Sequence, residues 1–336
     1  MDIGTFAVNT PLVRGEQFKF SALADTFMAS YAGRDATFSS KLHFFTQHLG
    51  GIIASEIDAD HVDDCLNALR KRGKLHYRAG TKRGGVSEST HKPLADATIN
   101  RYRCTLQSVL TWARKKRLMP KGWTNPVNET ERMPEGMIRK RYLKPDEYER
   151  LLKMTRISYW KKLTALVMLA VTTGARRGTL LGLKWKDVNL ERGEAFVQRT
   201  KNGEPFVLIL TNDVALELRK FRGKGNDDEY LFCGDNPFKP ANFNKSWNQA
   251  LKDAKLENTT ETPPDERLVF HSLRHTHASW LAQQGAPLLA IADSMGHKSL
   301  SMTKRYAHLC VDSRKDLINR TFLNSQSALE VRPQER

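Results

Sequence analysis

Apolar residues recur at helical spacing through most of the first 120 positions. Residues 18–33 (FKFSALADTFMASYAG) and 37–48 (TFSSKLHFFTQH) carry them three and four apart, the period of one helix face. Asp58 and Asp60 stand where helix N-caps are found, ahead of HVDDCLNALRKR. The segment 97–117 (ATINRYRCTLQSVLTWARKKR) has the strongest pattern. Its predicted apolar face consists of Ile99, Tyr102, Leu106, Val109, Leu110 and Ala113.

Two stretches interrupt this pattern. Residues 73–95 (GKLHYRAGTKRGGVSESTHKPLA) are rich in Gly, Ser and basic residues and have no periodicity, which predicts a loop that is mobile or ordered by a partner. Residues 121–140 (KGWTNPVNETERMPEGMIRK) hold two prolines and many polar residues, which predicts an interdomain linker. We therefore expect an N-terminal extension at 1–17, a helical domain at 18–120 and a linker at 121–141.

The second half is expected to be a mixed domain at 142–325, followed by a polar tail at 326–336. YLKPDEYERLLKMT predicts a helix start with Pro145 in its first turn, and the apolar stretch 160–171 predicts a buried helix. GEAFVQRT and PFVLIL flank Lys201-Asn202-Gly203, which predicts the one clear β-hairpin of the chain. The fold class is mainly α with a small antiparallel β-hairpin or sheet: an all-α N-terminal domain and a C-terminal domain of α with minor β.

Charge adds a class of partner. The chain of 336 residues has 54 Lys+Arg against 37 Asp+Glu, a formal net charge of +17, which favours a polyanion such as nucleic acid. Charge alone does not separate DNA from RNA or from an anionic membrane. The four cysteines are scattered without a C-x-x-C pair, which is typical of a reducing compartment. No stretch has the roughly 20 apolar residues of a membrane span, and no secretory leader is recognisable, so a cytoplasmic protein is expected.

Five stretches of the second half carry candidate chemistry: TTGARRGTLLGLKW, TKNG, HSLRHTHASWLAQQG, MGHKSL and TKRYAHL. Arg176 and Arg274 each offer a planar fork of donors that matches phosphate oxygens. His271 and Arg274 are three apart and share a helix face. The carboxylate cluster of a two-metal nuclease and the G-x-x-x-x-G-K-[ST] phosphate loop are both missing. Arginines with a side-chain nucleophile are one phosphoryl chemistry that needs no metal.

Each of these residues has an ordinary explanation when taken singly. A lone arginine solvates a helix face, Tyr306 is a core aromatic with a satisfied hydroxyl, and Lys201 is a solvated turn residue. His271, His275 and His277 suggest a metal by their spacing, but H-S-L-R-H lacks the Glu of H-E-x-x-H. No metal ion is therefore expected.

Taken in order, the stretches resemble the tyrosine recombinase family, the phage or lambda-type integrases. The family pattern is T-G-x-R, a Lys at a β-hairpin, H-x-x-R, G-H and R-Y-x-H. The matching residues here are Thr173 to Arg176, Lys201, His271 to Arg274, Gly296-His297 and Arg305 to His308. The resemblance spans about 142–310. In the first half, ATINRYRCTLQSVLTWA and Asn125-Pro126 are similar to the family's core-binding (SAM-like) domain. Thr179 departs from the pattern, because many members carry a supporting acid there.

The resemblance implies that DNA is cut and rejoined without cofactor, metal or ATP. Tyr306 would be the nucleophile that forms a 3′-phosphotyrosyl bond. Arg176 and Arg274 would stabilise the pentacoordinate phosphate, with His297 hydrogen-bonded to it. Lys201 would be the general acid for the 5′-oxygen, and His271 would assist proton transfer at Tyr306.

The resemblance also implies partners. Both domains would clamp double-stranded DNA, and the chain would act as a homotetramer on two recombination sites, being a monomer or weak oligomer in free solution. A C-terminal helix near 312–325 would be exchanged between protomers, and the reaction would integrate or excise a mobile element. The expected phosphate contacts are Arg101, Arg103, Arg114, Lys115 and Lys116 of the basic helix and Arg78, Lys82 and Arg83 of the 73–95 loop. That loop is equally explained as a disordered insertion.

Three other functions compete. A type IB topoisomerase would share the tyrosine and the arginines but relax DNA without a partner site. The compact R-Y-A-H ending and the first domain favour a recombinase. A DNA-binding regulator that has lost catalysis is disfavoured because all six site residues are intact. An RNA-binding protein is disfavoured because no RNA-module signature is present.

Overall fold

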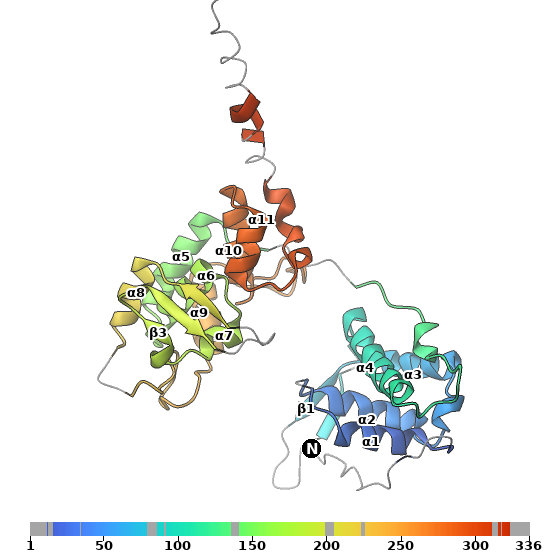
Figure 1. Cartoon of the computed structure of the whole chain (residues 1–336). Coiled ribbons are helices and arrows are strands. Elements are labelled where there is room, and N and C mark those ends of the chain that lie inside the picture. The colour runs from blue at the N-terminus through green and yellow to red at the C-terminus, as the bar shows by residue number, and fades with distance from the viewer. Residues whose placement is uncertain are drawn as a thin grey trace, which may run out of the picture. The chain divides into compact units, whose positions relative to one another are not determined.

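The chain forms two compact units, each with its own hydrophobic core. The computed structural model describes residues 12, 16–33, 35–78, 86–90, 92–135, 141–198, 205–222, 226–310, 315–316 and 318–322. The units are Met1–Met137 and Ile138–Arg336 (Figure 1). Helices with one small three-stranded sheet in the second unit confirm the predicted fold class. Among the helices that the structure describes, none combines the length and apolar composition that crossing a bilayer requires.

In the described part of the first unit, four α-helices confirm the helical segments predicted from periodicity. They are α1 (Phe20–Ala29), α2 (Phe38–Leu49), α3 (Ala59–Arg72) and α4 (Asp96–Lys115), with the short 3₁₀ turns η1 (Ala54–Glu56) and η2 (Pro126–Asn128). Asp58 caps α3, since its carboxylate accepts a hydrogen bond of 2.9 Å from the backbone N–H of His61. Asp60 lies in the first turn of α3, where the positive end of the helix dipole favours an acidic side chain.

Helix α4 packs against α1, α2 and α3 through the predicted apolar face. Ile99, Leu106, Val109, Leu110 and Ala113 are almost completely buried, while Tyr102 is partly buried. Because these side chains repeat at the helical period, they form one stripe that faces the core.

The segment 73–95 is not wholly a loop, as was predicted. It contains the antiparallel strands β1 (Leu75–Arg78) and β2 (Val86–Ser89), with Leu75 opposite Ser89. Strands of four residues that include charged and small side chains are too short for a period of two to be recognisable. The side chains of Arg78, Lys82 and Arg83 lie outside the described part of the structure.

The predicted linker is also largely wrong, because residues 121–135 pack on the first unit. The side-chain amide of Asn125 donates to the carbonyl oxygen of Gln107 (3.1 Å) and to Thr111 Oγ1 (3.0 Å). The indole N–H of Trp123 donates to the carbonyl oxygen of Ser55 at 3.1 Å, and Val127 is fully buried. The prolines and polar residues of this stretch make turns and caps on a folded surface. Residues 136–140 lie outside the described ranges.

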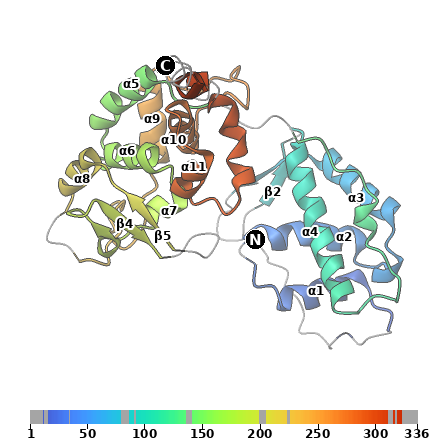
Figure 2. The same ribbon diagram turned by 45° about the horizontal axis from the view of Figure 1, so that its top comes forward.

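The second unit is built around two buried helices. Its helices are α5 (Pro145–Arg156), α6 (Leu163–Thr173), α7 (Arg177–Leu181), α8 (Asn212–Arg219), α9 (Asn244–Asp253), α10 (Ser272–Gln283) and α11 (Leu288–Met295), with 3₁₀ turns η3 (Trp185–Asp187), η4 (Leu300–Met302) and η5 (Lys304–Cys310). Helix α10 contacts α6, α11 and η5, and Figure 2 shows α10 and α11 side by side. The predicted helix start at Pro145 and the predicted buried helix within 160–171 are both confirmed.

The predicted hairpin is confirmed as β4 (Glu194–Val197) and β5 (Phe206–Ile209), which pair antiparallel with Phe196 opposite Val207. A third strand, β3 (Val188–Asn189), pairs with β4 and was not predicted. Ala195 and Leu208 face the core, whereas Phe196 and Val207 are exposed. Residues 199–204 of the turn, including Lys201, lie outside the described residues.

Candidate active site

A glycine in the left-handed backbone conformation sets the position of the first arginine. Helix α6 ends at Thr173, and Gly174 follows with φ 61°. A Cβ atom on Gly174 would lie 2.5 Å from Cδ2 of His277, so this position has neither the backbone angle nor the room for a side chain. The turn then places Arg176 at the N-cap of α7. The next arginine, Arg177, stacks its guanidinium 4.6 Å above the ring of Phe243.

The second arginine, Arg274, has a buried nitrogen without a hydrogen-bond partner among the described residues. Arg274 of α10 is only 5% exposed. Its Nη1 donates to the carbonyl oxygens of Gly174 (2.5 Å) and Met295 (2.9 Å), whereas the buried Nη2 has no hydrogen-bond partner among the described residues. Burial and the neighbouring charge of Arg176 lower the pKa of Arg274 to about 10, so the group is still cationic at neutral pH. A buried cation with an unused donor is matched to an incoming anion.

The candidate nucleophile is held inside the unit. Tyr306 of η5 is 5% exposed and packs with Ile291 and Met295 of α11. Its hydroxyl lies 2.6 Å from Nδ1 of His275. Burial raises the pKa of Tyr306, against the opposing effect of Arg305 and Arg274, so the phenol is neutral in the free protein.

His297 follows a second left-handed glycine, Gly296, which ends α11 with φ 62°. Its Nδ1 lies 2.8 Å from Oγ1 of Thr303, a fully buried residue. Burial, followed by the field of Arg274 and other arginines, lowers the pKa of His297 to about 4. The imidazole is therefore neutral at pH 7, and in the tautomer whose Nδ1 accepts from the threonine hydroxyl, Nε2–H is a donor.

Four of the six predicted catalytic residues thus come together. Arg176, Arg274, His297 and Tyr306 lie close enough for their charges to act on one another. His271 is at the N-cap of α10 with an exposed side chain, and its ring lies edge to face against the ring of His275 at 5.3 Å between centroids. His275 is hydrogen-bonded to Tyr306, and the predicted role of His271 in proton transfer stays a prediction. The place of Lys201 is not described.

Comparison with known proteins assigns this arrangement to a family. The model of the phage integrase family matches residues 141–312, about half of the chain. The chain belongs to the phage integrase family. The integrase of Salmonella phage P22 is 27% identical over 292 residues, which are 80% of this chain and 70% of that protein. The tyrosine recombinase XerA of Saccharolobus solfataricus is 25% identical over 254 residues, 75% of this chain and 77% of that one.

The fold agrees with solved integrases. A chain from the structure of a lambda integrase tetramer bound to a Holliday junction superposes with a TM-score of 0.62 at 20% identity, covering 89% of this chain and 81% of that one. Together these similarities confirm the predicted recognition of the chain as a tyrosine recombinase, a site-specific DNA recombination enzyme.

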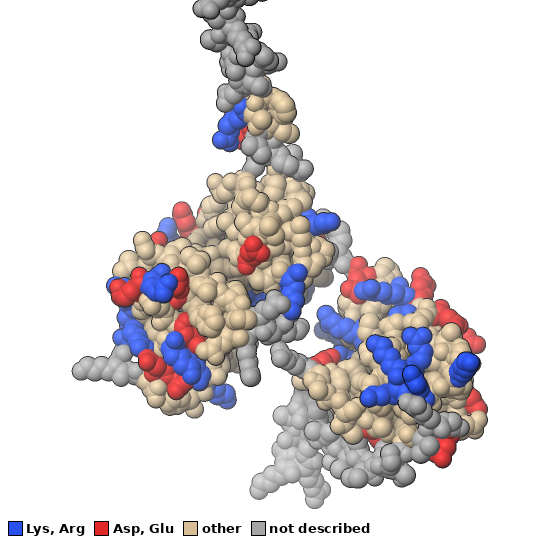
Figure 3. Space-filling view, in the orientation of Figure 1, with Lys and Arg blue, Asp and Glu red and all other residues tan. Residues whose placement is uncertain are grey.

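The basic residues predicted for DNA divide into two groups. Arg101, Arg114, Lys115 and Lys116 are exposed on or beside α4, and Figure 3 shows Lys and Arg side chains gathered over the region where α4 runs in Figure 1. Arg103 is different and the prediction for it is wrong. It is buried, and its guanidinium donates to Thr130 Oγ1 (2.9 Å) and to the carbonyl oxygens of Val127 and Thr130. It fastens the segment after α4 instead of facing solvent.

Two residues of the recombinase site were missed from sequence. His275 had been considered only as a metal ligand, although it follows Arg274 directly. Thr303 had no role, although it precedes Tyr306 by three residues. Among the described residues, no group of three His, Cys, Asp or Glu side chains is arranged to hold a metal ion.

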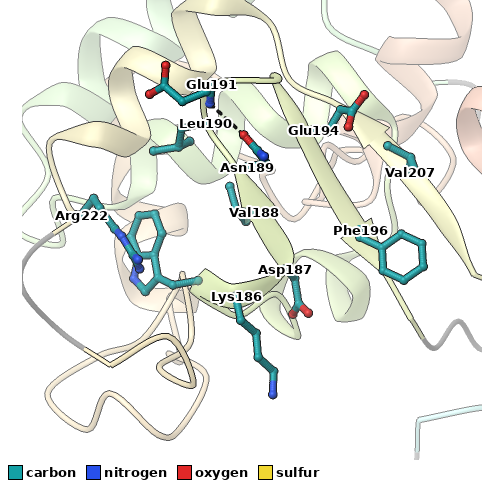
Figure 4. Close-up of a pocket in the computed structure, with 11 residues that line it drawn as sticks. Lys186, Asp187, Val188, Asn189, Leu190, Glu191, Glu194, Phe196, Val207 and Arg222 are labelled. Carbon is teal, nitrogen blue, oxygen red and sulfur yellow. Dashed lines mark hydrogen bonds between the residues drawn. The ribbon is translucent and has the colours of Figure 1, made fainter.

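A cavity of about 550 Å³ lies elsewhere, beside the sheet. Figure 4 shows Phe196 and Val207 of the open sheet face on one side of it, and Arg222 on the other. The side-chain oxygen of Asn189 accepts from the backbone N–H of Glu191 at 3.1 Å and shapes the turn after β3. None of the residues brought together around Tyr306 lines this cavity, so it is separate from the candidate active site.

Proposed function

We propose that this recombinase cuts DNA by attack of Tyr306 Oη on a scissile phosphate, forming a 3′-phosphotyrosyl bond and releasing a 5′-hydroxyl. The observation that carries the proposal is the unused Nη2 donor of Arg274 beside a buried tyrosine. Arg176 supplies the second positive charge and neutral His297 a hydrogen bond. Charge that develops on the phosphate is thereby stabilised by preorganised donors, which typically contribute 10²-fold or more each. No metal ion or nucleotide enters this scheme.

Lys201 is proposed as the general acid that protonates the 5′-oxygen. The support comes from the strand beside its turn. The ring of Phe206, the first residue of β5, lies 3.6 Å from where a Cβ of Gly296 would be, which is next to His297. Lys201 precedes Phe206 by five positions, which span at most about 18 Å of chain, so this length of chain allows the lysine to reach the site.

The DNA duplex is proposed to lie against the exposed basic residues of α4, with the 73–95 segment as a further contact. Phosphate contacts of this kind give salt-dependent binding without sequence specificity. The proposed contacts are Arg101, Arg114, Lys115, Lys116, Arg78, Lys82 and Arg83.

We further propose that the chain works in the cytoplasm as a homotetramer on two DNA sites, in the integration or excision of a mobile element. A lambda integrase tetramer bound to a Holliday junction is among the solved structures that share this fold, which supports the proposal. Residues 315–316 and 318–322 are helical, and Ile318 is 55% exposed, which fits the exchange of this segment between protomers.

Covalent trapping tests the chemistry. Nicked duplexes from the DNA that flanks the gene are incubated with wild type, Tyr306→Phe and Tyr159→Phe, without metal ion or nucleotide. Tyr159 is 69% exposed and outside the site, so it is the matched control. A denaturation-resistant adduct is expected from wild type and Tyr159→Phe and not from Tyr306→Phe. Binding by the wild type without any adduct would favour a regulator that has lost catalysis, whereas cleavage without exchange between two sites would favour a topoisomerase.

Lys201→Ala tests the general acid. Its cleavage defect should largely disappear on a duplex with sulfur in place of the 5′-bridging oxygen, because a thiolate leaves without a proton. An equal defect on both duplexes would contradict this role.

A further inference from the structure

The hydrogen bond between Tyr306 and His275 has no part in the mechanism proposed above. His275 is 9% exposed, and its Nδ1 lies 2.6 Å from the tyrosine hydroxyl. A group that touches the attacking oxygen is placed to receive its proton, which is the first geometric requirement of a general base.

Two other imidazoles of this region, those of His277 and His297, are hydrogen-bonded to other groups. In His277, Nδ1 is hydrogen-bonded to the carbonyl oxygen of Val171 (2.9 Å) and Nε2 to Oγ of Ser294 (3.0 Å). Burial lowers the pKa of His277 to about 4. His297 has its Nδ1 on Thr303, and its pKa is also lowered to about 4 by burial and nearby arginines. Both are therefore poor proton acceptors near pH 7.

We propose that His275 is the general base for Tyr306, a catalytic role that rests on the function proposed above. The Oη–H bond breaks and its proton moves to Nδ1 of His275, while the oxygen electron pair forms the bond to phosphorus. The bond from phosphorus to the 5′-oxygen breaks, and that oxygen takes a proton from the general acid. Rejoining reverses each transfer, so protons and electrons balance over the cycle.

The charges around Tyr306 and His275 make the proton transfer between them depend on bound substrate. His271 and Arg274 lie on α10, Arg305 on η5, and Arg176 on the turn after α6. Helix α6 has no titratable residue, and Asp293 of α11 is exposed. In the free protein these three arginines add positive charge around the pair. A bound phosphate offsets them, so a reactive phenolate forms only when DNA is in place.

The test separates proton transfer from positioning. Adduct formation is followed against pH with the nicked duplex that carries a 5′-bridging sulfur, since the leaving group then needs no acid. The variants are His275→Asn, whose amide oxygen can accept a hydrogen bond but not a proton, and His271→Asn as the neighbouring control. Thermal unfolding confirms that each variant is folded.

We expect His275→Asn to react about 100-fold more slowly at pH 7 and to gain close to tenfold per pH unit up to the ionisation of the phenol. His271→Asn should change the rate by a common factor and keep the wild-type profile. An unchanged rate and profile in His275→Asn, with wild type active, would overturn this inference alone. Absence of any wild-type adduct would overturn the proposed function and the inference with it.

A second experiment leaves His275 intact, in case its substitution prevents folding. Tyr306 is replaced by a ring-difluorinated tyrosine, whose phenol is more acidic. If His275 is the base, the pH at which the rate levels off stays where it is in wild type. A displacement of that pH by the difference in phenol acidity would refute the proposal.

Discussion

Gly174→Ala should weaken the second unit considerably. Alanine at φ 61° costs about 1–2 kcal/mol because its Cβ crowds the following carbonyl. The new Cβ would also lie 2.5 Å from Cδ2 of His277, and moving that ring disturbs hydrogen bonds to Val171 and Ser294, each contributing about 1 kcal/mol. The lower entropy of the unfolded chain offsets up to about 1 kcal/mol. The net loss is about 2–3 kcal/mol.

The loss should also reach catalysis, because the carbonyl oxygen of Gly174 anchors Nη1 of Arg274 at 2.5 Å. Urea-dependent hydrogen exchange with mass spectrometry measures the opening free energy of peptides from α6 and α10, and peptides from α4 are the internal reference. Gly178→Ala is the matched control. Gly178 lies in α7 with nothing within 4 Å of an added Cβ, so alanine should be neutral or stabilise by up to about 1 kcal/mol. A change below about 1 kcal/mol in Gly174→Ala would refute the reasoning.

Three further outcomes follow from named contacts. Thr303→Val removes the partner of His297 Nδ1 and should slow adduct formation about five- to tenfold, corresponding to about 1 kcal/mol, while Thr303→Ser restores it; equal rates in all three would exclude the positioning role. Arg103→Ala should destabilise the first unit by about 2–4 kcal/mol and leave the salt dependence of DNA binding unchanged, whereas Lys115→Ala should reduce the slope of log K against log salt by about 1 without destabilisation. Because the pKa of His277 is about 4 in the folded state and about 6.5 when unfolded, the unfolded state binds more protons between these values. Stability should therefore fall as pH is lowered from 6.5 to 4, by up to about 1.4 kcal/mol per pH unit, and urea midpoints of His277→Asn should depend less on pH.

Elements with a strong period could be predicted from the sequence, since burial of one face dictates the pattern. Helix α4 shows this, with its stripe from Ile99 to Ala113. Local signals with a direct backbone cause were equally informative: Pro145 begins α5, and Asp58 caps α3.

The stretch 121–135 shows why the remainder could not be predicted. Its polar composition is the same for a solvated linker and for a segment whose side chains cap and bridge a folded surface. Only the structure shows Asn125 bonded to two residues of α4 and Arg103 bonded to Val127 and Thr130. A basic helix face therefore overstates the DNA-binding surface whenever one of its arginines is used internally.

In the active site, too, some residues could be predicted from the sequence and others could not. The order of arginines, histidines and tyrosine could be recognised because each occupies a short motif, and T-G-x-R even has a steric cause in Gly174. Which histidine is hydrogen-bonded to Tyr306 could not be predicted from the sequence. Arguments from helix faces need one side of the helix to be exposed, and nine of the twelve residues of α10 are buried. With neighbours on nearly every side, His275 and Arg274 both reach the site although they are adjacent in sequence. In a buried helix, periodicity therefore does not indicate which residues contact the catalytic groups. The hydrogen bond of 2.6 Å to Tyr306 is the observation that identifies His275.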